Sequence, residues 1–209
     1  MSIFKPFISN ESIKIVNQTL KSGYINEGKR VKEFEKLLSK KLNFKNPVAL
    51  NSGTSALHLG LLIGGVKPGD EVILPAQTFI ASASSVLMCG AKPVFADINI
   101  HDGNIDLSSI EKKITKKTKA IMPVHWAGYP CDLDEISKIA KKNKLFVIED
   151  AAHALGAEYK KKKIGSISDF TCFSFQSIKH LTTGDGGALC CKKNKNFEIA
   201  QKLKWFGID

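Results

Sequence analysis

Two charged residues of this sequence stand where their surroundings would make them reactive. Lys179 follows an apolar run and precedes a glycine turn at 184–187. Partial desolvation there would lower the pKa of its amine and make it nucleophilic. Asp150 ends the apolar run that begins at Leu145, so its carboxylate needs a cation or hydrogen-bond donors. Two plainer alternatives stay open at this point. Lys179 could lie on an exposed loop, and Asp150 could form an ion pair with a surface lysine.

Two further stretches could hold a flat, phosphorylated ligand. Residues 51–56 read Asn-Ser-Gly-Thr-Ser-Ala before an apolar helix, so Gly53 lets the backbone approach an anion, and Thr54 and Ser55 add hydroxyl donors. Helix capping alone would also favour these residues. Phe79 could stack on a flat ring, although an aromatic at such a position more often belongs to the core.

Taken together, these features match one cofactor, pyridoxal phosphate. The helix N-terminus could bind its phosphate, and the aromatic Phe79 could stack on its ring. Asp150 could pair with its pyridinium nitrogen, and Lys179 could form a Schiff base with its aldehyde. No metal site is predicted, because the five cysteines form no CxxC pair and their number is odd.

The elements that must position these residues alternate between strand and helix. Apolar patterning predicts strands at 47–50, 71–75, 93–98, 119–125, 145–150, 169–175 and 187–191. It predicts helices around 13–20, 31–38, 55–63, 79–88, 107–114, 132–142 and 197–206. Such alternation predicts an α/β fold with a mostly parallel sheet covered on both faces, and ligands then bind at the carboxyl ends of the strands.

Composition excludes several classes of protein. The 209 residues are 43% apolar and 24% charged, which is ordinary for a globular domain and unlike a disordered chain or a coiled coil. The net charge of +11 comes from lysine, since Arg30 is the only arginine, so we favour a solvated surface over a nucleic-acid partner. Free thiols indicate the cytoplasm, and no apolar run is long enough for a membrane span.

Several stretches, in order along nearly the whole chain, resemble the DegT/StrS-type sugar aminotransferases, which are fold-type I pyridoxal-phosphate enzymes. They are KSGYI with EG at 21–28, SGTSALHL at 52–59, GDEVI through TF at 69–79, GAKPVF with Asp97, PVH with Gly128, EDAAH at 149–153, and FSF, Lys179 and GDGG at 173–187. The resemblance implies an aspartate-aminotransferase-like large domain with three α/β/α layers.

The resemblance also implies roles for individual residues. Lys179 would be the catalytic Schiff-base lysine and proton shuttle, and Asp150 would pair with the ring nitrogen. The cofactor would further contact Gly53, Thr54, Ser55, Phe79, His153 and Ser174. The implied reaction moves an amino group, usually from glutamate, to a keto group of a nucleotide-linked deoxysugar for polysaccharide or secondary-metabolite synthesis. The implied assembly is a homodimer, and the composition adds the expectation of no membrane and no nucleic-acid partner.

Two departures from the family pattern define the alternatives. Related sugar dehydratases carry a histidine in place of the lysine, and here His180 adjoins Lys179. Family members also continue past the position of Asp209 into a small C-terminal domain. We therefore expect an N-terminal segment at 1–30, a cofactor domain at 31–209 and no small domain, and a non-catalytic fragment is a third possibility. A P-loop at 23–30 is disfavoured, because Arg30 stands where Ser or Thr should be.

Overall fold

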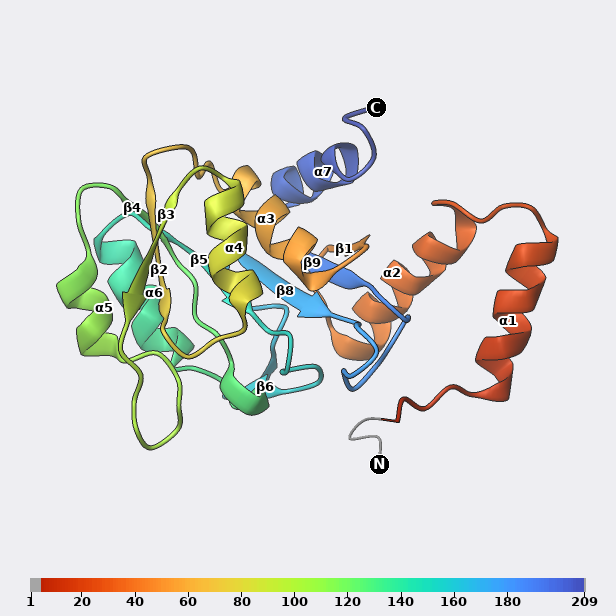
Figure 1. The fold of residues 1–209 in the computed structure, drawn as a ribbon, viewed down its shortest axis with the longest axis horizontal. Helices are drawn as coiled ribbons and strands as arrows, with labels where there is room; N and C mark the ends of the chain where they lie inside the picture. Colours follow the sequence, from red (N-terminus) through yellow and green to blue (C-terminus); the bar gives the residue numbers. More distant parts are fainter. Residues whose placement is uncertain (1–4, 209) are drawn as a thin grey trace.

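The protein is built around one seven-stranded sheet (Figure 1). The computed structural model describes residues 5–208. Across the sheet the strands lie in the order β1 (Pro47–Leu50), β9 (Gly187–Cys191), β8 (Phe170–Ser174), β5 (Phe146–Asp150), β4 (Thr118–Ile121), β2 (Glu71–Pro75) and β3 (Lys92–Ala96). A separate two-stranded hairpin consists of β6 (Glu158–Tyr159) and β7 (Lys162–Lys163).

Six of the seven strands run in the same direction. The pairs β3–β2, β2–β4, β4–β5 and β5–β8 are parallel, whereas β9 lies antiparallel to both of its neighbours, β8 and β1. The mostly parallel sheet predicted from the alternating pattern is therefore confirmed. These five parallel strands, together with β1, point their carboxyl ends to the same edge, where ligands of such folds bind.

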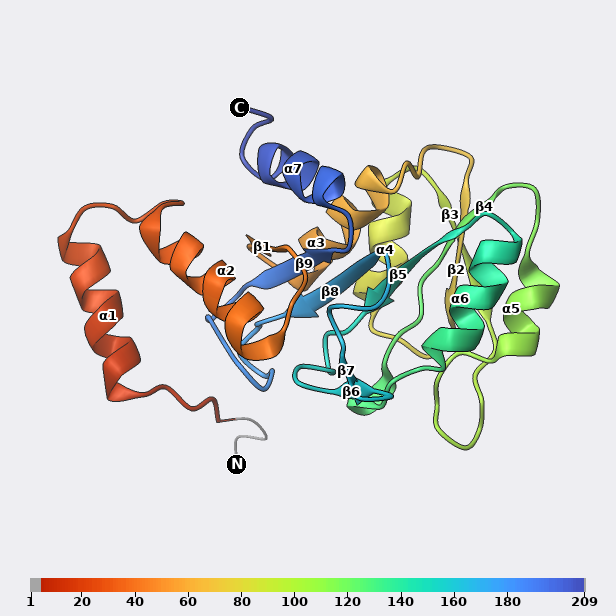
Figure 2. The same ribbon diagram turned by 180° about the vertical axis from the view of Figure 1, so that it is seen from behind.

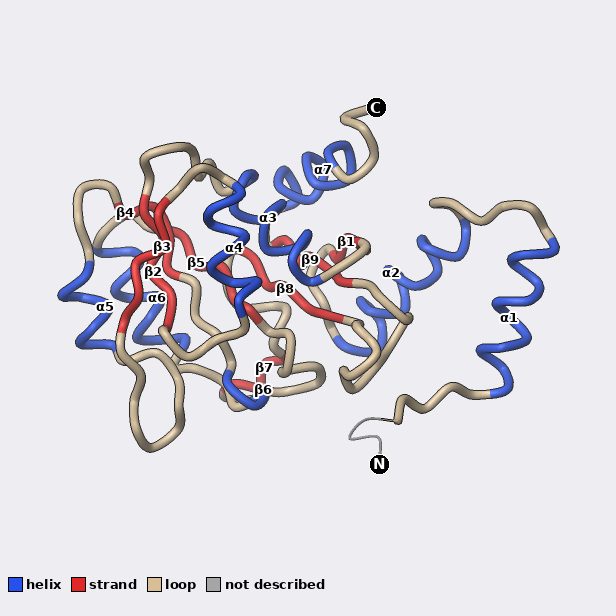
Figure 3. The backbone as a smooth tube through the Cα atoms, in the orientation of Figure 1, coloured by secondary structure: helices blue, strands red, loops and turns tan. Residues whose placement is uncertain are grey.

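Helices cover both faces of the sheet, which makes three layers (Figure 3). On one face lie α2 (Lys29–Leu42), α5 (Leu107–Lys113) and α6 (Leu133–Lys142); on the other lie α3 (Gly53–Ile63), α4 (Ile80–Met88) and α7 (Asn194–Leu203). Strand β2 shows how the sheet separates the two cores. Ile73 packs with α5 and α6, whereas Val72 and Leu74 pack with α3 and α4, since alternate residues of a strand face opposite sides.

Side-chain caps fix where several helices begin. The Asp106 carboxylate accepts a hydrogen bond from the Ser109 N–H at 2.7 Å, and Asp132 accepts one from the Glu135 N–H at 3.3 Å. Such a short acceptor side chain favours the start of a helix, because it satisfies an N–H group of the first turn. These two caps fix the first turns of α5 and α6, and both helices pack into the core on the same face of the sheet.

Helix α1 (Asn10–Lys21) lies at one end of the molecule, away from the sheet (Figures 1 and 2). None of its residues is buried, and Ile13, Val16 and Leu20 are at least half exposed. The predicted boundary between an N-terminal segment (1–30) and a cofactor domain (31–209) falls within the first turn of α2. The separate role of residues 1–30 stays a prediction.

Several predicted elements have different limits in the structure, and two of these differences have a clear physical cause. The strand expected at 119–125 ends at Ile121, because Pro123 has no N–H group to continue the ladder. The helix expected at 197–206 begins earlier, at Asn194, and ends at Leu203, before the chain turns through positive φ at Phe206 and Gly207. The first turn of α7 consists mainly of polar residues, so apolar patterning could not show that the helix begins at Asn194.

All five cysteines are buried free thiols. Within residues 5–208, no helix has both the length and the apolar character that a membrane span needs.

Candidate active site

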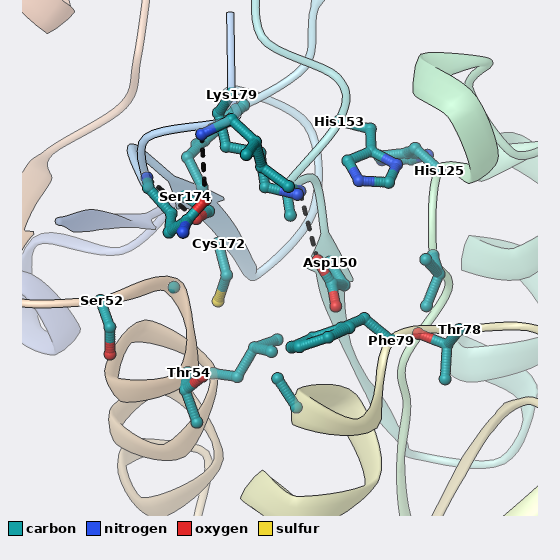
Figure 4. A pocket seen from close by; sticks show the side chains of 18 of the residues that line it. Ser52, Thr54, Thr78, Phe79, His125, Asp150, His153, Cys172, Ser174 and Lys179 are labelled. Carbon is teal, nitrogen blue, oxygen red and sulfur yellow. Dashed lines mark hydrogen bonds between the residues drawn. The ribbon is translucent and has the colours of Figure 1, made fainter. Parts of the chain in front are cut away.

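A cavity of about 670 Å³ opens at the carboxyl ends of β1, β2, β5 and β8 (Figure 4). Seven of the eight residues predicted to contact a cofactor line it: Gly53, Thr54, Phe79, Asp150, His153, Ser174 and Lys179. They are far apart in the sequence, and the parallel strands bring them together. The cavity also contains Ser52, Thr78, His125, Trp126, Cys172 and Gln176, which the sequence did not single out.

The N-terminus of α3 forms one corner of the cavity. Ser52 caps this helix, its hydroxyl accepting a hydrogen bond from the Ser55 N–H at 3.1 Å. The first helical hydrogen bond runs from the Ala56 N–H to the Ser52 carbonyl, so the N–H groups of Gly53 and Thr54 precede it in the first turn. This corner is suited to an anion, because these N–H groups and the positive end of the helix dipole face it.

Two glycines allow the strands to approach this corner. A Cβ atom on Gly53 would lie 3.0 Å from Cβ of Ser174, which is tighter than ordinary packing. A Cβ atom on Gly187, the first residue of β9, would overlap the backbone of Ser52. Position 187 therefore requires glycine, which brings β9 directly against the cap of α3, and a side chain at position 53 would force Ser174 to shift.

Ser55 lies outside the cavity, so its predicted contact with the phosphate through the side chain is not supported by this geometry. Its hydroxyl lies 3.0 Å from the hydroxyl of Ser52 and lines a second cavity, next to Glu27, His58 and Lys204. The reason is helical geometry, because consecutive residues of α3 project in directions about 100° apart and Thr54 takes the inward one.

The second cavity contains an ion-pair network that joins distant parts of the chain. The ammonium of Lys204, whose side chain is 3% exposed, lies 2.6 Å from Glu27 and 2.9 Å from Glu35. Glu35 also accepts a hydrogen bond from the Ala49 N–H at 2.9 Å. The network thereby ties α2 and the end of α7 to strand β1.

Asp150 projects from the end of β5 into the first cavity and is 6% exposed. Its Oδ2 accepts a hydrogen bond from the Ser82 hydroxyl at 2.7 Å, and its Oδ1 accepts one from the Ala152 N–H at 3.2 Å. Among residues 5–208 it forms no ion pair, so the alternative of a partner lysine on the surface is wrong. The carboxylate is held by neutral donors and borders a cavity in which a cation could approach it.

Lys179 follows β8 on the loop that leads to β9 and lines the same cavity. Desolvation lowers the pKa of its amine below the ordinary value for lysine, and the nearby Asp150 carboxylate opposes this effect. A lower pKa increases the fraction of neutral, nucleophilic amine at pH 7. Its partial burial also disfavours the alternative of a lysine on a fully exposed loop.

The neighbouring His180 is exposed and lies outside the described lining of the cavity. Of these two neighbouring side chains, Lys179 is the one that lines the cavity. This observation favours the aminotransferase pattern over the dehydratase pattern, in which a histidine replaces the lysine.

The Phe79 side chain is 72% exposed and borders the cavity next to Asp150 (Figure 4). The alternative of a core aromatic is wrong, since an aromatic ring of the core would be buried. Phe79 immediately precedes α4 and is its N-cap residue, so the start of this helix fixes the position of the ring. An exposed ring on the wall of a cavity can stack on a flat ligand.

His153 lies on the other side of the cavity, with its ring centroid 6.5 Å from that of Trp126. Burial lowers the pKa of its imidazole, and the positive charges of Lys179 and His180 lower it further, while Asp150 opposes them. A neutral imidazole at this position can accept or donate a hydrogen bond to a ligand without adding a charge.

His125, which lines the cavity, forms a buried pair with Glu149 that was not predicted from the sequence. Nε2 of His125 lies 2.8 Å from Oε2 of Glu149, and Nδ1 accepts the Cys131 N–H at 3.1 Å. The hydrogen of the imidazole therefore lies on Nε2, where it is donated to the carboxylate. The other oxygen of Glu149 accepts from Thr171 and from the Ser168 N–H.

Residues 6–209 match the model of the DegT/DnrJ/EryC1/StrS aminotransferase family. The chain belongs to this family. It is 45% identical to the spore coat polysaccharide biosynthesis protein SpsC of Bacillus subtilis over 95% of its length, and 44% identical to the GDP-perosamine synthase of Caulobacter vibrioides over all of it.

The fold is that of the family's solved structures. The putative sugar aminotransferase Spr1654 of Streptococcus pneumoniae, in its PLP form, superposes with a TM-score of 0.90 at 38% identity over 95% of this chain and 57% of that one. The predicted fold class is thereby confirmed. The chain spans about half the length of the curated relatives that it matches, 50% for SpsC and 57% for GDP-perosamine synthase.

Proposed function

We propose that this protein binds pyridoxal phosphate and transfers an amino group to a keto group of a nucleotide-linked deoxysugar. The observation that carries the proposal is the meeting, in one cavity, of Lys179, the Asp150 carboxylate and the first turn of α3. These three features offer a nucleophilic amine, a partner for a ring cation and an anion site.

The residues present fit the cofactor. Asp150 is buried and held only by neutral donors, so it can pair with the protonated ring nitrogen. The phosphate would take the N–H groups of Gly53 and Thr54, with the hydroxyl of Ser174 beside them. The ring of Phe79 would cover one face of the cofactor, and the neutral His153 would lie close to it.

Lys179 carries the chemical step that this chain's own residues perform. Bound pyridoxal phosphate supplies an electron-withdrawing ring, which makes a hydrogen removable from the carbon that bears the amino group. In the resting protein the Lys179 amine, with its lowered pKa, would be bonded to the aldehyde carbon, and once the amino donor has displaced it the free amine would serve as the base that moves this proton. Asp150 would keep the ring nitrogen protonated throughout.

The names of the relatives support the substrate class. Besides GDP-perosamine synthase, a relative 39% identical over the whole chain is the UDP-4-amino-4-deoxy-L-arabinose–oxoglutarate aminotransferase of Shewanella sediminis. Both names contain a nucleotide-linked amino sugar, and oxoglutarate is what glutamate becomes when it donates its amino group. The name of SpsC supports a role in polysaccharide synthesis.

We further propose that the enzyme works in the cytoplasm as a homodimer. Five buried free thiols suit a reducing compartment. Exposed apolar side chains of the N-terminal region, including Ile13, Val16 and Leu20, offer a surface that a second copy could cover.

Reduction with borohydride tests the cofactor site. We expect the protein mixed with pyridoxal phosphate to turn yellow, and borohydride followed by peptide mapping to find the cofactor on Lys179. The Lys179→Ala variant should lose this label, whereas Lys195→Ala, which changes an exposed lysine of α7, should keep it. A colourless protein or a label on another lysine would contradict the site.

Amino transfer from glutamate to a 4-keto-deoxysugar nucleotide tests the reaction. Formation of oxoglutarate together with the amino sugar would support the proposal. Loss of a sugar hydroxyl without transfer of nitrogen would instead indicate a dehydratase.

A further inference from the structure

A chain of two hydroxyl groups leads to Asp150 from the start of α4. The Thr78 Oγ1 atom lies 2.6 Å from the Ser82 Oγ atom, which lies 2.7 Å from Oδ2 of Asp150. Ser82 is completely buried, and Thr78 borders the cavity. Neither hydroxyl was predicted to act on the site, because a serine within a helix has no signal of its own in the sequence.

The direction of the hydrogen bonds in this chain follows from the carboxylate. An ionised carboxylate can only accept, so the Ser82 hydroxyl must donate its single hydrogen to Asp150. The contact with Thr78 then requires the Thr78 hydroxyl to donate to Ser82. The hydrogen bonds therefore all point towards Asp150, an arrangement in which each bond strengthens the next.

The same turn of the chain also positions the aromatic wall. The Ser82 N–H donates to the Phe79 carbonyl at 3.1 Å, so the residue that holds Asp150 is fixed to the backbone of Phe79. The Ala152 N–H holds the other oxygen of Asp150. The plane of the carboxylate is thereby determined by two donors on different elements.

We propose that Ser82, supported by Thr78, is a positioning residue that orients Asp150 towards the ring nitrogen of the cofactor. This inference depends on the proposed cofactor site. The orientation of Asp150 would affect the protonation of the cofactor as well as its position. A proton held on the ring nitrogen lowers the pKa of the nitrogen that joins Lys179 to the cofactor, because both positive charges would share one conjugated system.

The test is a pH titration of the visible absorption of protein loaded with pyridoxal phosphate. In Ser82→Ala, we expect the midpoint of the titration to rise by at least half a pH unit and the Kd of the cofactor to increase about 10-fold. Loss of a hydrogen bond to a charged group has this order of effect. Ser82→Thr, which keeps the hydroxyl, should restore the wild-type midpoint.

Ser85→Ala is the matched control. Ser85 lies on the same helix and is equally buried, but its hydroxyl donates to the Ser82 carbonyl and not to Asp150. We expect its midpoint to equal that of the wild type. A shift of the same size in Ser85→Ala would show a general effect of disturbing α4 and would overturn the inference.

Thr78→Val provides a second variant should Ser82→Ala fail to fold, because Thr78 is only partly buried. It removes the donor to Ser82 at nearly constant volume, and a smaller shift in the same direction is expected. Unchanged midpoints in both variants would overturn the inference while leaving the cofactor site intact. A wild-type protein without visible absorption would instead overturn the proposed function.

Discussion

Glu149 and Asp150 are adjacent on β5, yet their carboxylates occupy different environments. Glu149 points away from the cavity and lies 2.8 Å from Nε2 of His125, whereas Asp150 points into the cavity. The alternation of side chains along a strand produces this separation. One carboxylate is thus available to a ligand, and the other supports the loop that follows β4.

We predict that Glu149→Gln lowers the free energy of unfolding by about 2 kcal/mol, because it leaves a buried donor without an acceptor. The NH₂ group of the glutamine must face either the Ser168 N–H or His125. The imidazole cannot adapt by moving its hydrogen to Nδ1, since that atom faces the Cys131 N–H. Urea denaturation measures the effect.

The control is Glu135→Gln, which breaks an ion pair with Lys138 on the exposed face of α6. We expect a change of less than about 0.5 kcal/mol there, since surface pairs of this kind contribute little. Equal effects at the two positions would contradict the role of Glu149.

The lowered pKa of Lys179 makes the stability of the cofactor-free protein depend on pH. Below this lowered pKa the folded and unfolded states are both protonated, and the cost of desolvating the charge is present in full. As the pH rises from the lowered pKa to 10.5, the unfolded state binds more protons and this cost disappears. The wild type should therefore gain stability over this window.

Lys179→Met removes the charge, so we expect it to be slightly more stable than the wild type at pH 7, with the difference vanishing near pH 10.5. The effect should stay below about 1 kcal/mol, because the amine is partly solvated. Lys195→Met on α7 should show no such trend. Denaturation curves at several pH values measure this difference in stability between Lys179→Met and the wild type. A difference that grows with pH would contradict the lowered pKa of Lys179.

Gly187→Ala should destabilise the protein by about 2 kcal/mol or more and weaken phosphate binding, since a methyl group there overlaps the backbone of Ser52. Thermal unfolding and cofactor titration measure the two effects. In Gly28→Ala, the new methyl group meets its nearest atom at 4.0 Å, so cofactor binding should stay normal. Normal cofactor binding in Gly187→Ala would contradict the tight fit.

Phe79→Leu should leave the stability nearly unchanged, because the ring is 72% exposed. The loss of stacking should weaken cofactor binding by about 0.5–1.5 kcal/mol. Leu87→Ala, at the other end of α4 and 60% exposed, should bind the cofactor normally. An unaltered affinity in Phe79→Leu would show that the ring does not touch the cofactor.

Much of this architecture could be predicted because local patterns define its elements. The apolar run that ends at Asp150 and the small residues after β1 mark strand ends, and the carboxyl ends of parallel strands share one edge. The positions of Gly53, Asp150 and Lys179 at one cavity follow from this rule. The pairing of β1 with β9 does not, since these strands are separated by most of the chain and either could have formed an edge.

The directions of individual side chains could not be predicted from the sequence either. Ser55 was expected at the phosphate because its type suits an anion, but only the rotation of α3 decides that Thr54 faces inwards and Ser55 outwards. Ser82 and His125 were missed for the opposite reason. Their types are common in ordinary helices and cores, and their importance comes from partners, Asp150 and Glu149, that lie far away in the sequence.

The reversed direction of β9 has a consequence for the order in which the protein is assembled. Strand β1 pairs with β9 alone, in the register Pro47 with Cys190 to Leu50 with Gly187. During synthesis, β1 leaves the ribosome first and cannot join the sheet until residues 187–191 have followed. The anion corner after β1 can therefore form only after β9, and with it Lys179, has been synthesised.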